Sequence, residues 1–178
     1  MKILRLFNPF FRWWLRSGRY PWSRFRRKYF ESKYLDTTLP EVHSVEEIRD
    51  NLSEVTWTMD GPLHLFDAIS YPQTVWNRKK DDCDGFSILA ASLLGQWNPE
   101  TKPILLTVLM WPMRKSHTVC VFNMPGQGLC YFDNYSLRQG DFGSYAEIAA
   151  RVKVDNELIC WDTVDPETLE TIEFHETL

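Results

Sequence analysis

The segment from Asp81 to Leu94 constrains the fold most, because it joins an acidic turn to a strongly apolar run. Aspartates dominate the turn, and short polar side chains of this kind are favoured at the N-cap of a helix. After Gly85, apolar residues recur on one face of a helix with a period of 3.6 residues. The sequence therefore predicts a buried helix that begins at or just before Cys83.

Cys83 would lie where the chemistry of a thiol is easily changed. Unpaired backbone N–H groups and the helix dipole at such an end favour a thiolate over a thiol. The neighbouring Asp81, Asp82 and Asp84 act in the opposite direction, since negative charges raise the pKa of a thiol. A cysteine nucleophile also needs a base and a group that orients the base. These partners have to come from elsewhere in the chain.

A candidate base and a candidate orienting group lie on two predicted strands. His117 begins one β-branched and aromatic run, Asp133 ends another, and residues 125–128 between them are turn formers, which predicts a β-hairpin. A hairpin symmetric about Pro125 would place His117 directly opposite Asp133 on one face of the sheet. A helix-start cysteine, a histidine and an aspartate in this order match a nucleophile, its base and its orienter.

These residues resemble a known family. Residues 72–134 are similar to the transglutaminase-like superfamily, particularly its small bacterial cysteine-peptidase-like members. The resemblance rests on the run Asp82–Phe86, on His117 in a strand, and on Asp133 in the next strand after a Gly-rich turn. Two positions depart from the family pattern: Gly85, where members often have a second acidic residue, and residues 118–119, which replace a frequent Ala-Trp pair.

The resemblance implies an α+β, papain/transglutaminase-like fold. A catalytic-type cysteine would stand at the N-terminus of a core helix, and the helix would pack on an antiparallel sheet that carries the histidine and the aspartate. Residues 36–178 would form this domain. Residues 1–35 would form a separate basic and aromatic N-terminal arm.

The resemblance also implies cysteine-dependent acyl transfer. Cys83 would attack a carboxamide carbonyl, His117 would move the proton, and Asp133 would hold the imidazole. We expect the acceptor to be water, giving hydrolysis of a peptide or amide bond in a peptide or protein substrate, because water reacts unless a dedicated site excludes it. The alternative is a structural or adaptor component of a larger assembly, such as a phage virion, which keeps the fold and docks through its arm.

Three residues before the cysteine are candidates for stabilising an oxyanion or binding substrate. Asn77 lies six residues before Cys83, and papain-like enzymes place an amide donor at a similar distance. Trp76 and Gln73 are rival candidates. Ordinary surface or core roles fit all three residues at least as well.

The cysteine spacing predicts no metal site. The chain has four cysteines, and neither a C-x-x-C nor an H-E-x-x-H pattern occurs. A Gly-rich phosphate loop is also absent, so we expect neither a metal ion nor a cofactor. Cysteines this widely spread suit a reducing compartment. Cys120 and Cys130 should be neighbouring core thiols on the sheet face opposite His117, with a disulfide between them as the less favoured alternative.

Charge divides the chain into two parts. Residues 1–35 contain ten Lys and Arg residues against the single acid Glu31, although the whole chain has a net charge of −4. This asymmetry predicts a basic arm on an acidic body. Arg5 and Arg12 interrupt the apolar opening, which excludes a signal peptide and a transmembrane helix. We therefore expect a cytoplasmic protein or a virion component.

The arm should contain an amphipathic helix from Asn8 to Gly18. The residues expected to bind a partner are aromatic or basic: Phe10, Trp14, Trp22, Arg12, Arg16, Arg24 and Arg27. Four targets remain open for the arm. They are its own acidic domain or a second subunit, a partner protein, an anionic membrane surface, and nucleic acid, which the acidic body disfavours.

Overall fold

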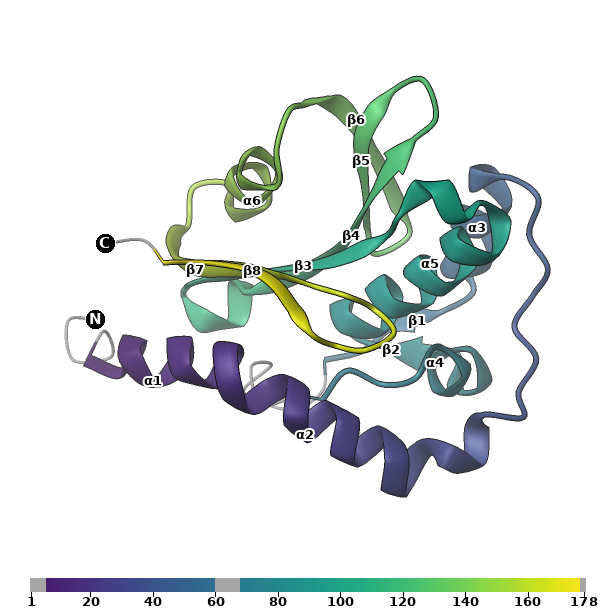
Figure 1. Cartoon of the computed structure of the whole chain (residues 1–178), viewed down its shortest axis with the longest axis horizontal. Coiled ribbons are helices and arrows are strands. Elements are labelled where there is room, and N and C mark those ends of the chain that lie inside the picture. The colour runs from purple at the N-terminus through teal and green to yellow at the C-terminus, as the bar shows by residue number, and fades with distance from the viewer. Residues whose placement is uncertain (1–5, 60–67, 177–178) are drawn as a thin grey trace.

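An antiparallel sheet separates the helices of this protein into two layers (Figure 1). The structure is a computed structural model that describes residues 6–59 and 68–176. The sheet has the order β6 (Ser136–Phe142), β5 (Gly128–Asp133), β4 (His117–Met124), β3 (Ile104–Trp111), β7 (Glu157–Val164) and β8 (Thr171–Glu176). A short parallel pair, β1 (Thr56–Trp57) and β2 (Lys80–Asp81), lies apart from it.

Three of the helices in the body start at residues whose side chains cap them. The body contains α3 (Val45–Ser53), α4 (Pro72–Arg78), α5 (Cys83–Trp97) and α6 (Tyr145–Lys153), with short 3₁₀ turns at Pro99–Thr101 and Met113–Lys115. Asp82 is the N-cap of α5, and its side chain accepts a hydrogen bond from the backbone N–H of Asp84 at 3.0 Å. Ser44 and Ser144 cap α3 and α6 in the same way. The predicted helix start at Cys83 is therefore confirmed.

The sheet is covered on both faces. On one face α5 packs Leu89 and Leu93 against a cluster that includes Cys120 and Phe122. On the other face α6 packs against a second cluster, which includes Val119. Strand β3 contributes to both clusters and is buried along almost its whole length, as its continuous apolar sequence predicts. The observed architecture is the predicted α+β fold, with the core helix on an antiparallel sheet.

The hairpin of β4 and β5 forms, with one difference from its predicted register. Cys120 pairs with Phe132, which centres the turn on Gly126 and not on Pro125. Gly126 has a φ of +78°, a left-handed conformation that glycine adopts at little cost and that lets the chain reverse here. The shift is two residues, so His117 and Asp133 stay on the same face. They form a diagonal pair and are not directly opposite each other.

The arm is one nearly continuous helix laid along the body (Figure 1). It runs through α1 (Asn8–Trp13), the π-helical turn Trp14–Gly18, α2 (Arg19–Arg26), a second π-helical turn Arg27–Glu31 and the 3₁₀ turn Ser32–Tyr34. The predicted end at Gly18 is wrong. A Cβ atom at Gly18 would lie 2.3 Å from the Trp14 ring, so glycine here admits the indole and does not stop the helix.

The inner face of the arm is part of the protein core and carries polar anchors as well. Leu15 and Tyr20 are 1% and 2% exposed and belong to the cluster around α5. The Tyr20 hydroxyl donates to Asp162 at 2.6 Å. Arg27 donates to the backbone carbonyls of Ile69 and Ser70 at 3.0 and 2.8 Å. Of the predicted targets, the structure shows the arm packed on its own domain.

Glu31 anchors the end of the arm to the start of α4. Its carboxylate is 1% exposed and accepts hydrogen bonds from the Tyr71 backbone N–H at 2.9 Å and from the hydroxyls of Ser70 and Thr74. The single acid of residues 1–35 is therefore turned inward. Among the residues that the structure describes, no helix is long and apolar enough to cross a bilayer.

The structure explains why glycine stands at position 85. A Cβ atom there would lie 2.3 Å from the side chain of Asp81, whereas a Cβ at Gly95, in the same helix, has nothing within 4 Å. Replacing glycine by alanine in a helix normally stabilises by about 0.5–1 kcal/mol. We expect Gly95→Ala to raise the free energy of unfolding by about that amount, and Gly85→Ala to lower it by about 1–3 kcal/mol through overpacking.

Urea unfolding measures both changes. Removing the colliding side chain with Asp81→Gly in the Gly85→Ala background should recover part of the loss. Equal stabilisation by the two alanine substitutions would show that Asp81 does not crowd Gly85.

Candidate functional site

The first turn of α5 is joined directly to the first residues of β4. Cys83 is 8% exposed, and its sulfur forms a hydrogen bond with the backbone of Thr118. The hydroxyl of Ser87 lies 3.1 Å from the Thr118 carbonyl oxygen and 2.8 Å from that of Cys83. The helix start and the strand start are therefore held together at the point where Cys83 and His117 lie.

His117 and Asp133 form a hydrogen-bonded pair. Nε2 of His117 lies 2.8 Å from Oδ1 of Asp133, and the guanidinium of Arg138 lies 3.9 Å from the other carboxylate oxygen. The hydrogen bond with His117 lowers the pKa of Asp133 below its usual value. Because Nε2 is engaged, Nδ1 is the imidazole nitrogen left for another partner.

Cys83 and His117 line the same cavity. It has a volume of about 20 Å³, and Leu15 and Arg19 of the arm also line it. That volume holds about one water molecule. No hydrogen bond between Cys83 and His117 is present in this part of the described structure. By register His117 belongs to the sheet face of Val119, away from α5, and it reaches the cavity as the first residue of β4.

A buried ion pair holds the arm beside the cysteine. The guanidinium of Arg19 pairs with the carboxylate of Asp84, and both side chains are 4% exposed. Arg19 also donates to the hydroxyl of Thr107 at 3.2 Å. Burial alone would lower the pKa of Arg19, but the charge of Asp84 and its hydrogen bond, acting together with Tyr20 and Asp162, raise the pKa above its usual value. The guanidinium of Arg19 is therefore charged.

Cys83 is a thiol in this arrangement. Burial raises its pKa well above the usual value, and the charges of Asp84 and Asp82 raise it further. The hydrogen bond from Thr118 and the charge of Arg19 act in the opposite direction and do not compensate. Burial and the acidic neighbours therefore raise the pKa of Cys83 by more than the helix start was expected to lower it.

Asp82, Cys83 and Asp84 are the one group in the described ranges whose potential metal-ligand atoms lie within 4.8 Å of one another. One carboxylate oxygen of each aspartate is already engaged by the protein. Asp82 accepts from the Asp84 backbone N–H as the cap of α5, and Asp84 pairs with Arg19. All four cysteines are free and buried, and Cys120 and Cys130 face α5 without a disulfide.

The residues predicted to stabilise an oxyanion do not line the Cys83 cavity. Asn77 is exposed, and its amide donates to Thr37 at 3.4 Å. Trp76 is partly buried against the core. Gln73 lines a different cavity, of about 820 Å³, beside later turns of α5 that include Ala91 and Gly95. The structure therefore does not bring these three residues to Cys83.

The residues predicted to bind a partner divide between the two faces of the arm. Phe10 and Trp22 are 43% and 45% exposed, and Arg16 and Arg24 are exposed as well. Arg12 lies 3.6 Å from Glu176 of β8. Two of the seven face the body: Arg27 is bound to backbone carbonyls, and Trp14 packs against the core.

Leu15 and Arg19 line the cavity from the arm, and neither was among the predicted site residues. Arg19 lies 65 positions from Asp84, and no motif connects the two. The only local signal is the spacing of Leu15, Arg19, Ser23 and Arg27, which repeats every four residues and marks one helical face. Its mixture of apolar and charged residues does not identify it as a buried face.

Comparisons with known proteins support the fold. The structure resembles calcium-bound LapG of Legionella pneumophila, a transglutaminase-like cysteine protease, with a TM-score of 0.50 at 14% sequence identity. The match covers 75% of this chain and 67% of LapG. The chain has a transglutaminase-like fold. A second LapG structure has a TM-score of 0.49 at 15% identity, and the match covers 72% of this chain and 67% of that one. An EGTA-treated LapG structure has a TM-score of 0.49 at 14% identity, and the match covers 75% of this chain and 65% of that one. No protein-family model matches the chain, and no curated protein gives a significant sequence match.

Because the cavity is closed, alkylation of Cys83 should be slow. We expect iodoacetamide to label Cys83 of the native protein at pH 7.5 more slowly than it labels free cysteine. The thiolate is the form that reacts, and the raised pKa of Cys83 keeps this side chain protonated. Replacing Leu15 with alanine should open the cavity to water and speed labelling by about tenfold or more.

Mass spectrometry of the labelled peptides separates Cys83 from the other three cysteines. Leu52→Ala is the matched control, because Leu52 is equally buried in the same core but does not line the cavity. Both substitutions should lower stability by about 2–5 kcal/mol. Labelling of the native protein as fast as free cysteine, or equal acceleration in both variants, would contradict closure by Leu15.

Proposed function

We propose that this protein is a cysteine-dependent acyl-transfer enzyme that hydrolyses a peptide or amide bond. The observation that carries the proposal is the 2.8 Å pair of His117 and Asp133 beside a cavity that Cys83 also lines. Acyl transfer needs a nucleophile, a base and a group that orients the base. Cys83 at its helix start, the imidazole of His117 and the carboxylate of Asp133 can supply these three parts. The transglutaminase-like fold is consistent with this chemistry.

The chemistry begins with transfer of the Cys83 proton to Nδ1 of His117. The thiolate then attacks the carbonyl carbon, and Asp133 stabilises the imidazolium through Nε2. The C–N bond breaks as His117 returns the proton to the leaving amine, which leaves a thioester on Cys83. Water attacks the thioester, gives one proton to His117 and releases the acid. The C–S bond breaks and the thiol is restored.

The backbone supplies one donor for the oxyanion of this reaction. The N–H of Cys83 stands in the first turn of α5, where a helix has no acceptor of its own for it. Asn77, Trp76 and Gln73 do not line the Cys83 cavity, so the proposed oxyanion donor is the backbone N–H at the start of α5.

Substrate can enter only after the arm moves. A cavity of about 20 Å³ cannot admit a peptide carbonyl together with its flanking chain. Leu15 and Arg19 close it from the arm side. The arrangement described is therefore the resting, closed state of the proposed enzyme, and the high pKa of Cys83 belongs to that state.

Single substitutions of Cys83 and Asp133 test whether these residues are needed for cleavage. Full-length protein is incubated with a peptide library from a digested proteome, and new termini are counted by mass spectrometry. We expect Cys83→Ala to abolish cleavage and Asp133→Asn to lower its rate by about 10²–10⁴-fold, because the imidazole loses its orienting charge. The control is Cys160→Ala, another buried cysteine outside the cavity, which should keep activity.

A structural or adaptor role in a larger assembly, such as a phage virion, is the second candidate. The observation that favours it is the combination of a closed, protonated Cys83 with a row of exposed aromatic side chains on the arm. Cleavage that survives Cys83→Ala, or no cleavage by the full chain and by Leu15→Ala, would favour this role over hydrolysis.

A further inference from the structure

The arm differs from an ordinary surface helix on both faces, because its outer face is apolar and its buried face mixes Leu15 and Tyr20 with polar side chains. Its buried face contains Arg19, Ser23, Arg27 and Glu31, each 4% exposed or less. Its outer face presents large apolar side chains with exposures between 43% and 76%: Leu6, Phe7, Phe10, Trp13, Trp22, Phe25, Tyr29, Phe30 and Leu35. A soluble helix normally has the opposite arrangement. Exposed apolar side chains gathered in this way mark an interaction site.

The outer apolar residues form two aromatic groups. Near the start of the arm, the rings of Phe10 and Trp13 lie 5.9 Å apart. Further along, Phe25 contacts Trp22, Tyr29 and Phe30, with ring centroids 5.6, 4.7 and 6.3 Å away. Within each group the rings contact one another along the helix, and their outer faces remain exposed.

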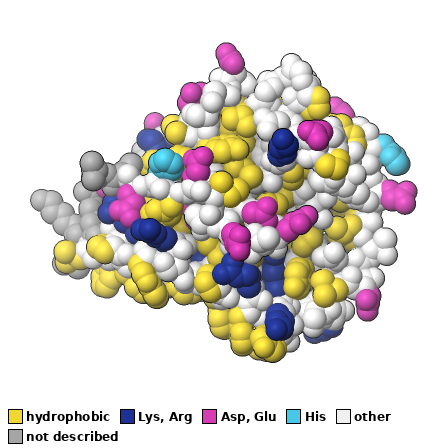
Figure 2. Space-filling model, viewed as in Figure 1, with side chains coloured by type: hydrophobic (Ala, Val, Ile, Leu, Met, Phe, Trp, Pro, Cys, Tyr) yellow, Lys and Arg dark blue, Asp and Glu magenta, His cyan; other side chains and the backbone are white. Residues whose placement is uncertain are grey.

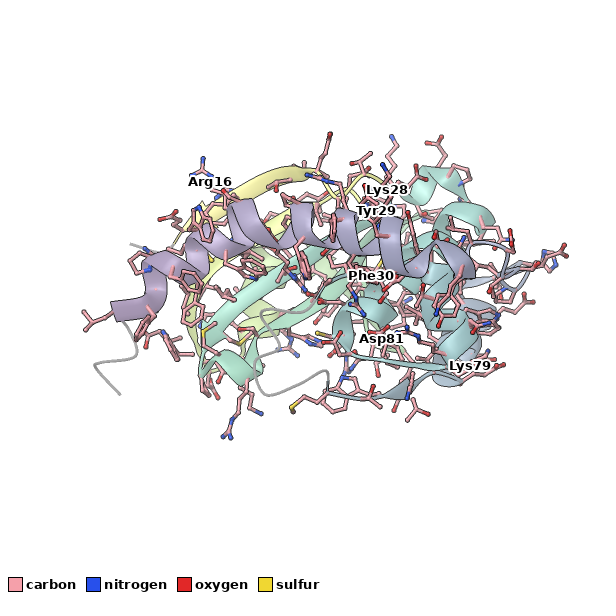
Figure 3. All side chains as sticks on the ribbon, turned by 90° about the horizontal axis from the view of Figure 1, so that it is seen from below. Arg16, Lys28, Tyr29, Phe30, Lys79 and Asp81 are labelled. Carbon is pink, nitrogen blue, oxygen red and sulfur yellow. The ribbon has the colours of Figure 1, made fainter. Side chains whose placement is uncertain are left out.

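Basic side chains accompany the aromatic rings. Arg16, Arg24, Lys28 and Lys33 are exposed, and the one acid of residues 1–35, Glu31, is buried. Figure 2 shows hydrophobic side chains along the lower edge of the molecule, over the arm, with basic side chains beside them. In Figure 3, which looks at the arm from below, Arg16 and Lys28 lie along the edge nearer to β8. The outer face is thus aromatic and positively charged.

We propose that the outer face of the arm binds the surface of an anionic lipid bilayer. Trp, Tyr and Phe side chains partition into the headgroup region, and Lys and Arg are attracted to anionic headgroups. The helical arm lies parallel to such a surface, with its rings inserted and its basic residues among the phosphates. This proposal does not depend on the chemistry of Cys83.

The shape of the arm favours a flat lipid surface as the occupant. Residues 8–34 form a ridge about 40 Å long at 1.5 Å per residue. The ridge lies on the outside of the molecule with its inner face fixed by Tyr20, Arg27 and Glu31, so it is preformed and pays no folding cost on binding (Figure 1). The rest of the chain is acidic and is repelled by the same anionic lipids. This repulsion orients the molecule with the arm toward the bilayer and the body away from it.

Vesicle co-sedimentation tests the proposal with the full-length protein. The probes are sucrose-loaded vesicles of phosphatidylcholine alone and of phosphatidylcholine with phosphatidylglycerol at a ratio of about three to one. We expect binding to the anionic vesicles in 50 mM NaCl, at least about tenfold weaker binding to the neutral ones, and loss of binding in 500 mM NaCl, because salt screens the attraction.

Two variants on the outer face separate the apolar and the charged contributions. Trp13→Ser with Phe25→Ser removes inserted rings and should weaken binding. Lys28→Gln with Lys33→Gln should lower the partition coefficient by roughly 25-fold, at about fivefold per charge. All four residues are exposed, so the fold should be retained.

Matched controls lie outside the arm. Trp57→Ser with Ile172→Ser removes side chains that are 48% and 55% exposed, and Lys80→Gln with Lys115→Gln removes exposed charges. Both controls should bind as the unmodified protein does.

Three results would overturn the proposal. They are no binding to anionic vesicles at low salt, binding that the arm variants leave unchanged, and self-association through the outer face that excludes lipid. The last is seen in sedimentation velocity as an oligomer that Trp13→Ser with Phe25→Ser converts to monomer, in a protein that does not bind vesicles. It would assign the surface to a second copy of the chain.

Discussion

The buried pair of Arg19 and Asp84 is the contact on which the arrangement of this protein depends. It joins the arm to the first turn of α5, next to Cys83, and neither charge has enough contact with water to remain stable without the other. Burying two charges is costly, so the pair is weak evidence for added stability, but removal of one partner leaves an uncompensated charge in the interior. The arm and the start of α5 are therefore fixed to each other.

This constraint gives the two faces of the arm different tasks. The inner face supplies Leu15 and Arg19 to the cavity of Cys83 and His117, which keeps the thiol protonated and shielded from water. The outer face carries exposed aromatic and basic side chains. Because one rigid helix carries both faces, a force that pulls the outer face away from the body would also open the cavity.

The sequence predicts the parts of the fold that local patterns encode. The N-cap at Asp82, the helix after it and the hairpin that carries His117 and Asp133 follow from turn chemistry and periodicity within short segments. The register of the hairpin differs by two residues, because Gly126 takes the left-handed position that sets the turn. The pairing of Arg19 with Asp84 could not be predicted, since it joins segments 65 positions apart and buries residue types that are usually exposed.

A double-mutant cycle on Arg19 and Asp84 measures whether this pair holds the arm at the first turn of α5. The free energy of unfolding is measured in urea for Arg19→Met, Asp84→Asn and the double variant. The account predicts a loss of about 3–5 kcal/mol for each single substitution and a loss for the double variant that is smaller than their sum by about 2 kcal/mol or more. Small losses that add without coupling would contradict it, because the arm would then not be held at Cys83 by this pair.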